Sequence, residues 1–159
     1  MLRLSKLTDY AVVVMVRLGR VAVVATSAGV AAATGVPEPT VAKVLKALTG
    51  AGLVVSQRGA RGGYRLARPL TDISLADVIH AIDGPIALTA CVDGGAGCEV
   101  EHVCAVRGRW DLVNEAILTA FRAISLADLA AASVPAAFRL PVLSPATPSL
   151  PTATSLHAE

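Results

Sequence analysis

The stretch Pro39–Pro69, PTVAKVLKALTGAGLVVSQRGARGGYRLARP, decides the fold of this chain. In its first third, apolar residues recur at helical spacing, and these are Val41, Val44, Leu45 and Leu48. The pattern predicts a helix that begins around Pro37 to Thr40, runs to Thr49 and turns one face to a core. The opposite face carries Thr40, Lys43 and Lys46, which leaves basic side chains facing outward.

Two strand-like runs follow this helix within the same stretch. Leu53–Gln57 and Gly63–Ala67 are separated by RGARG, so they are predicted to form a β-hairpin. The tip and second strand carry Arg58, Arg61 and Arg65. A flexible, Arg-rich tip suits phosphate groups or a DNA minor groove. The alternative is a basic turn that is simply exposed to solvent. This would account for Arg58 or Arg61 alone, but it accounts poorly for the three arginines together with the preceding helices.

Two further helices are predicted before this stretch. Thr26–Thr34 reads as a short Ala-rich helix closed by Gly35, and a short turn joins it to the Lys-bearing helix. This pair has the form of a helix-turn-helix, and with the hairpin it makes a winged helix. Lys6–Gly19, capped by Ser5, is apolar nearly all round, which indicates that a second subunit covers part of it.

The second half of the chain adds three predicted helices. Ser74-x-x-Asp77 is a capping-box-like start for a helix over Leu75–Ile82, and Ser125-x-x-Asp128 opens a short one. Between them, a helix over Val106–Ile124 carries an apolar stripe made of Trp110, Val113, Ile117, Ala120 and Ile124. Such a stripe can be a core face, but a long helix beyond a small winged domain favours dimerisation. The expected fold class is mainly α with a small β-hairpin wing, a winged helix-turn-helix plus a long dimerisation helix.

The charge of the chain is divided unequally between its halves. Residues 1–68 hold ten Lys and Arg against two acids, or +8, and residues 69–159 hold four against ten, or −6, which sum to the net +2. A basic half joined to an acidic half suggests a polyanion-binding module with an attached second function. Uneven surface charge is common, so the division of charge supports nucleic-acid binding only together with the predicted helix-turn-helix.

Composition and motifs exclude other classes of protein. The apolar stretch Ala11–Val36 contains Arg17 and Arg20, each of which costs ~2.5–3.5 kcal/mol at a bilayer centre, so we expect no membrane contact. No secretory leader is recognisable, which indicates the cytoplasm, where thiols stay reduced. The sequence shows no paired carboxylates, no nucleophile with an adjacent base and no phosphate-binding glycine loop. We therefore expect that the protein is not an enzyme and has no small-molecule substrate.

All cysteines of the chain lie in one short segment, CVDGGAGCEVEHVC, as Cys91, Cys98 and Cys104. Three thiols cannot pair off completely as disulfides, and their spacing is wider than that of a zinc knuckle. The glycines allow the segment to wrap a bulky group, so an iron–sulfur cluster is expected. Buried cysteines that merely fill space, or a zinc ion, are the alternatives.

These observations divide the chain into three parts. Residues 1–70 form the winged helix-turn-helix, and residues 71–132 form the cluster-binding loop and dimerisation helix of the same domain. Residues 133–159 hold five prolines among Ala, Ser and Thr and are expected to be a disordered tail.

Several stretches resemble the winged-helix iron–sulfur regulators that include IscR and NsrR, and most closely the regulators of SUF-system cluster assembly. The resemblance covers Met1–Ala130 and rests on MLRLSKLTDYA, on the Pro39–Pro69 stretch, on GPIALTAC and on the three cysteines. It implies a homodimeric transcription factor, expected to be a repressor, that binds a roughly palindromic operator. A 2Fe-2S or 4Fe-4S cluster would report cluster supply or redox stress, and the targets would be SUF-type cluster-assembly genes.

The fourth ligand of such a cluster is open. In the IscR pattern a histidine follows the last cysteine by three residues, but here that residue is Arg107, which stays protonated and cannot ligate. The first gap between cysteines is also one residue longer than in IscR. The NsrR branch uses an aspartate of a T-D pair in the partner subunit, which matches Asp9 here. His102 ranks second, and Glu99 and Glu101 follow. Alternatively, Asp9 is simply a first-turn carboxylate.

Two other functions remain possible at this point. An iron–sulfur electron carrier would use the basic face to dock an acidic partner and would show reversible redox without sequence-selective DNA binding. A zinc-stabilised winged-helix adaptor would be colourless and would not sense clusters.

Overall fold

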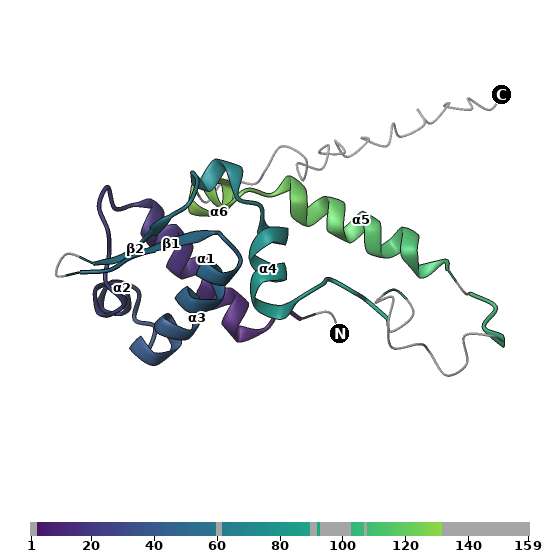
Figure 1. The fold of residues 1–159 in the computed structure, drawn as a ribbon. Coiled ribbons are helices and arrows are strands. Elements are labelled where there is room, and N and C mark those ends of the chain that lie inside the picture. Colours follow the sequence, from purple (N-terminus) through teal and green to yellow (C-terminus); the bar gives the residue numbers. More distant parts are fainter. Residues whose placement is uncertain (1–2, 60–61, 90–91, 93–102, 107, 132–159) are drawn as a thin grey trace, which may run out of the picture.

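The computed structural model describes residues 3–59, 62–89, 92, 103–106 and 108–131. Helices and a two-stranded hairpin follow the chain in the order α1 (Lys6–Gly19), α2 (Ser27–Thr34), α3 (Glu38–Gly50), β1 (Val54–Gln57), β2 (Gly63–Leu66), the 3₁₀ turn η1 (Leu70–Asp72), α4 (Leu75–Asp83), α5 (Trp110–Ala123) and α6 (Leu126–Ala130). Figure 1 shows α1–α4 and the hairpin gathered in one body, from which α5 extends. The predicted fold class, mainly α with a small β-hairpin wing, is confirmed. The dimerisation role of the long helix stays a prediction.

The core of this body lies between α1, α3 and α4. The fully buried apolar side chains of α3 come from the stripe that the sequence indicated, and those of α1 come from the helix predicted to be apolar nearly all round; they are Ala11, Val14, Met15, Val41, Val44, Leu45 and Leu48. Burying a Val, Leu or Met side chain contributes ~1.5–3 kcal/mol before the entropy of ordering is counted. α1 begins at the expected cap, where the Ser5 hydroxyl accepts the Thr8 N–H at 3.1 Å.

The hairpin is attached to the body through the connection between α1 and α2. β1 and β2 pair antiparallel, with Val54 opposite Leu66 and Gln57 opposite Gly63. Ala25 and Tyr64 exchange backbone hydrogen bonds of 2.9 and 2.8 Å. A side chain at Gly63 would lie 2.6 Å from the Ala25 carbonyl oxygen, so only glycine permits this approach.

The long helix is shorter than the sequence predicted. It begins at Trp110, not at Val106, and ends at Ala123. The residues just before it form turns, and Gly108 has the positive φ of +68°, which interrupts helical geometry. Its only buried residue is Asn114, whereas Trp110 and Val113 of the apolar stripe are 40% and 44% exposed.

After α5 the chain returns to the body. The Leu75 N–H donates to the Ile124 carbonyl at 2.8 Å, and the Leu126 N–H donates to the Ile73 carbonyl at 2.9 Å. Ile73 and Leu126 are both fully buried, so apolar packing reinforces this bridge. Ser74 and Ser125 each open a helix with a complete capping box, as predicted. No described helix is both long and apolar enough to cross a bilayer.

Candidate nucleic-acid interface and cysteine segment

The outer face of α3 is the first part of the candidate site. Lys43 and Lys46 are exposed and Thr40 is half-buried, while the opposite face of the helix lies in the core. α2 ends at Thr34 and is capped by Gly35, whose left-handed φ of +73° turns the chain towards α3, and Val36 is buried in the turn. A helix held by its apolar side with basic side chains outward is what insertion into a major groove requires.

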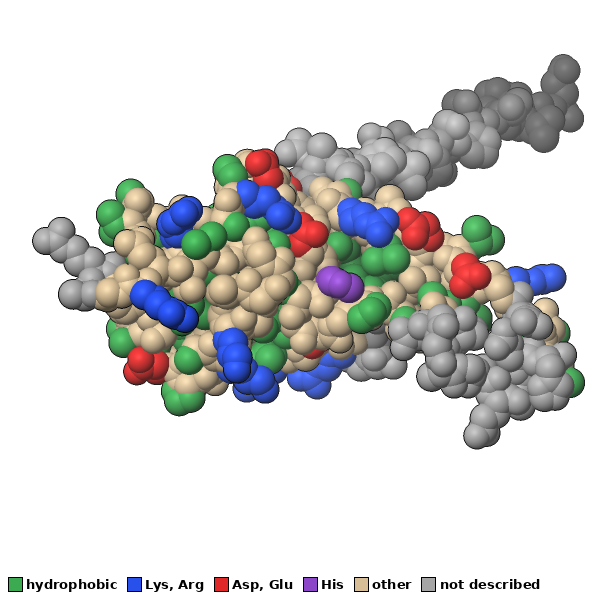
Figure 2. All heavy atoms as spheres, viewed as in Figure 1, with side chains coloured by type: hydrophobic (Ala, Val, Ile, Leu, Met, Phe, Trp, Pro, Cys, Tyr) green, Lys and Arg blue, Asp and Glu red, His purple; other side chains and the backbone are tan. Residues whose placement is uncertain are grey.

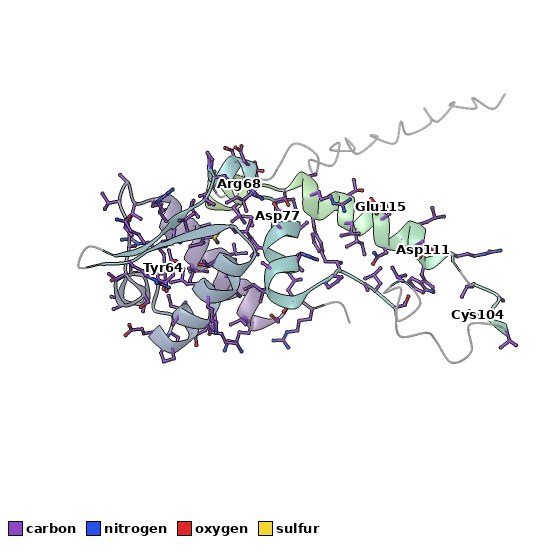
Figure 3. The ribbon with its side chains drawn as sticks, in the orientation of Figure 1. Tyr64, Arg68, Asp77, Cys104, Asp111 and Glu115 are labelled. Atoms are coloured by element: carbon purple, nitrogen blue, oxygen red, sulfur yellow. The ribbon has the colours of Figure 1, made fainter. Side chains whose placement is uncertain are left out.

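The hairpin is the second part of the candidate site. Arg58 and Arg65 are exposed, and Arg61 lies outside the described residues. Arg68, at the base of the hairpin, has a different role. Its guanidinium contacts the Asp77 carboxylate at 3.0 Å and donates to the Asp72 carbonyl at 2.9 Å, which ties the hairpin to the start of α4. Figure 3 shows Arg68 and Asp77 side by side.

The charge division of the sequence has a counterpart on the surface. Figure 2 shows Lys and Arg side chains over the part of the molecule that holds α3 and the hairpin, where few acidic side chains are visible, whereas over η1, α4 and α5 acidic side chains lie among Lys and Arg. The basic end of the body is therefore the candidate nucleic-acid interface.

Asp9, the candidate fourth ligand, lies exposed in the first turn of α1. It lines a groove of about 640 Å³ whose other residues are Arg3, Leu4, Ser5, Lys6, Thr8, Val12, Leu75 and Leu129. The Lys6 ammonium lies 5.8 Å from the centre of the Tyr10 ring. An exposed carboxylate in an open groove is accessible to a group supplied by another subunit.

A hydrogen-bonded link next to Asp9 joins α1 to the end of α4. The Thr8 hydroxyl donates to the Asp83 carboxylate at 2.6 Å, and the Ser5 N–H donates to the same oxygen at 3.4 Å. Slight burial raises the pKa of Asp83, but the bonds from Thr8 and Ser5 outweigh it and hold the pKa below its usual value. Nothing in the sequence indicated this link, because Asp83 simply follows the end of the helix predicted over Leu75–Ile82.

A second link joins the chain after α4 to α5. The Asn114 side chain donates to the Ile86 carbonyl at 3.0 Å and accepts the Leu88 N–H at 3.1 Å. Ile86 and Leu88 precede Cys91 closely in the sequence. The only sequence signal was a polar residue beside the apolar stripe of the long helix.

The cysteine segment lies largely outside the described residues. Cys91, Cys98 and His102 fall there, as do the lower-ranked Glu99 and Glu101 and the departure at Arg107. Cys104 is described, and it is a half-buried free thiol before the start of α5, away from the winged body (Figure 3). Within the described ranges, no three His, Cys, Asp or Glu side chains gather as a metal site.

The chemistry of the donor set is nevertheless that of a metal centre. Three thiolates from one Gly-rich segment are soft ligands of the type that holds iron–sulfur clusters or zinc. Cys104 is accessible enough to act as one of them, and Asp9 offers a hard oxygen donor. The residues present are therefore compatible with a cluster.

Comparisons with known proteins agree with this geometry. Residues 4–132 match a family model described as Rrf2, an iron-dependent transcriptional regulator. A helix-turn-helix-type transcriptional regulator of Mycobacterium tuberculosis is 35% identical over 136 residues, which cover 84% of each chain. CymR, the global cysteine regulator of B. subtilis, superposes with a TM-score of 0.66 at 27% identity, over 84% of this chain and 100% of CymR. IscR of T. potens superposes with a TM-score of 0.58 at 29% identity, over 80% and 85%.

Proposed function

Because the chain belongs to the Rrf2 family of winged-helix transcriptional regulators, we propose that it is a homodimeric repressor that binds operator DNA and carries an iron–sulfur cluster. The relatives and structural neighbours described above are transcriptional regulators and not enzymes, as the sequence led us to expect. The proposed operators stand before genes for SUF-type cluster assembly.

The DNA-binding proposal is supported above all by α3, which has one face buried in the core and an opposite face that carries exposed lysines. Val41, Val44, Leu45 and Leu48 are fully buried, so the helix is fixed in orientation. Lys43 and Lys46 are therefore presented to the outside together with Thr40. We assign these three residues to the major groove, and Arg58, Arg61 and Arg65 to the phosphate backbone or the minor groove.

Dimerisation is supported by apolar surface on two elements. Trp110, Leu112 and Val113 at the start of α5 are 40%, 78% and 44% exposed, and Val13 of α1 is 39% exposed. Large exposed apolar side chains that follow one another on a surface mark an interaction site. A second copy of the chain that covers α5 and the outer side of α1 would bury them.

The cluster is assigned to Cys91, Cys98 and Cys104, with Asp9 of the partner subunit as the first candidate for the fourth ligand and His102 as the second. When bound, the cluster supplies a sulfur-ligated iron centre that is sensitive to oxidation and to iron supply. The contribution of the chain is to place the Cys104 thiol before the start of α5 and Asp9 in an open groove on α1.

Anaerobic purification tests these assignments, with a visible spectrum, iron and sulfide counts, and DNA binding by fluorescence anisotropy. We expect a coloured protein that selects a palindromic site in front of cluster-assembly genes and discriminates it from a scrambled duplex. A colourless protein that binds zinc would favour the adaptor. A coloured protein with reversible redox and no sequence preference would favour the electron carrier.

A further inference from the structure

Asn114 is the buried residue of α5, although its side chain is polar. It is 6% exposed, although the neighbouring apolar residues Leu112 and Val113 are 78% and 44% exposed. A buried side-chain amide is costly unless its donor and acceptor are both satisfied. A polar residue that is the only buried side chain of its helix therefore needs hydrogen-bond partners.

The partner of Asn114 is the backbone of the segment that follows α4. Its amide N–H donates to the Ile86 carbonyl at 3.0 Å and its carbonyl accepts the Leu88 N–H at 3.1 Å. One side chain thus satisfies both a donor and an acceptor of a short piece of chain that is in neither a helix nor a strand. If packing alone mattered, leucine would fill this place as well as asparagine.

The same segment is held at its other end by α1. Asp83 accepts a hydrogen bond of 2.6 Å from Thr8, which directly precedes Asp9. Residues 83–88 are therefore attached to α1 at the start and to α5 at the end, and Cys91 follows three residues after Leu88. Along the chain, the contact between Leu88 and Asn114 therefore lies close to Cys91.

We propose that Asn114 is a positioning residue that clamps residues 86–88 to α5 and so couples the state of the cysteine segment to the affinity for DNA. The inference deepens the proposed function and rests on its assignment of DNA binding, but it does not depend on which metal the cysteines hold. Movement of residues 86–88 would shift α5, the proposed dimerisation helix, and with it the spacing of the two winged domains.

The experiment uses the full-length, metal-free protein before and after alkylation of its thiols with iodoacetamide, a probe that changes the cysteine segment without a cluster. Asn114→Leu removes both hydrogen bonds while it keeps the branching of the side chain, and Asn114→Ala removes them without the added bulk of the methyl groups if the first variant does not fold. Thr119→Leu makes the same polar-to-apolar change at an exposed position of α5 and serves as the matched control. Dissociation constants are measured on a duplex that the wild-type protein selects.

We expect alkylation to change the affinity of the wild-type protein and of Thr119→Leu by about fivefold or more, the usual lower range of coupling between sites. In the Asn114 variants the change should fall below about twofold while the affinity of the unmodified protein is retained. An unaltered response in these variants, or no response in the wild type, would overturn the proposal. If the Asn114 variants lose DNA affinity equally in the unmodified and the alkylated form, the role of Asn114 is only structural, and the proposal would also be overturned.

Hydrogen exchange at the Leu88 amide tests the clamp separately from DNA binding. The amide should be protected in the wild type and in Thr119→Leu, and should exchange severalfold faster in the Asn114 variants. Equal protection in all proteins would show that the clamp is absent. A colourless protein that keeps the alkylation response would refute the cluster and leave this inference intact.

Discussion

Thr8 and Asp83 are joined by a hydrogen bond of 2.6 Å between the Thr8 hydroxyl and the Asp83 carboxylate, across 75 positions of the chain. Thr8 is fully buried, whereas Asp83 is exposed at the end of α4. The bond connects the first turn of α1, which carries Asp9, to the end of α4 that leads towards the cysteines.

Thr8→Val should destabilise the protein by about 1 kcal/mol, because a hydrogen bond to an ionised carboxylate is lost while the shape of the side chain is kept. Urea unfolding measures this difference. Thr119→Val, at an exposed position of α5, is the control and should leave the unfolding midpoint unchanged. Equal midpoints for Thr8→Val and the wild type would show that the bond contributes nothing.

The same bond predicts how stability depends on pH. Because the pKa of Asp83 is held below its unfolded value, its contribution is complete above about pH 4 and is lost as the pH falls through the folded pKa. Asp83→Asn should therefore lose less stability than the wild type between about pH 5 and pH 3. The comparison is made by urea unfolding at each pH, and parallel curves would contradict it. The lowered pKa of Asp128 acts in the same direction in both proteins.

Lys43→Ala should reduce the preference for the operator over a scrambled duplex by ~1–3 kcal/mol if Lys43 contacts a base edge. Anisotropy titrations on both duplexes at several salt concentrations measure the preference and the salt slope. Arg122→Ala removes an equal charge from α5, where Arg122 is exposed and pairs with Glu115 at 3.2 Å, so it should bind like the wild type. A preference that survives in Lys43→Ala would rule out this helix face as the reader of bases.

Asp9→Ala should weaken or remove the visible absorption of the reconstituted protein and shorten the lifetime of its cluster, because one ligand is lost. Asp111→Ala is the matched control, since Asp111 is likewise an exposed acid in the first turn of a helix. An unchanged spectrum and unchanged cluster stability in Asp9→Ala would exclude Asp9 as a ligand, and His102→Ala would then be the next variant to measure.

Val113→Glu should convert the proposed dimer into a monomer, because a charge would be placed within the exposed apolar patch at the start of α5. Sedimentation velocity at micromolar concentration separates the two states. Thr119→Glu adds the same charge at an exposed position away from the patch and should leave the dimer intact. A Val113→Glu protein that sediments as a dimer would move the interface to another surface.

Local patterns in the sequence predicted most of the architecture. Ser5, Ser74 and Ser125 each open a helix as expected, and the inward face of α3 is buried as its spacing indicated. The N-terminal limit of α5 was wrong, because the apolar periodicity gave no weight to the turn at Gly108. The ligand roles of the cysteines and the base-reading role of Lys43 stay predictions.

The sequence by itself determined the helices, the hairpin, the buried stripes and the family, because caps, glycines and apolar spacing act between residues that are neighbours along the chain. Only the tertiary structure decided that Thr8 meets Asp83, that Asn114 binds the backbone beside Leu88, and that α6 returns to the body at Ile73. These contacts join polar groups far apart in the sequence. The spacing of residues along the chain does not predict these contacts. A polar side chain looks the same in a sequence whether it hydrogen-bonds to water or to a distant backbone group.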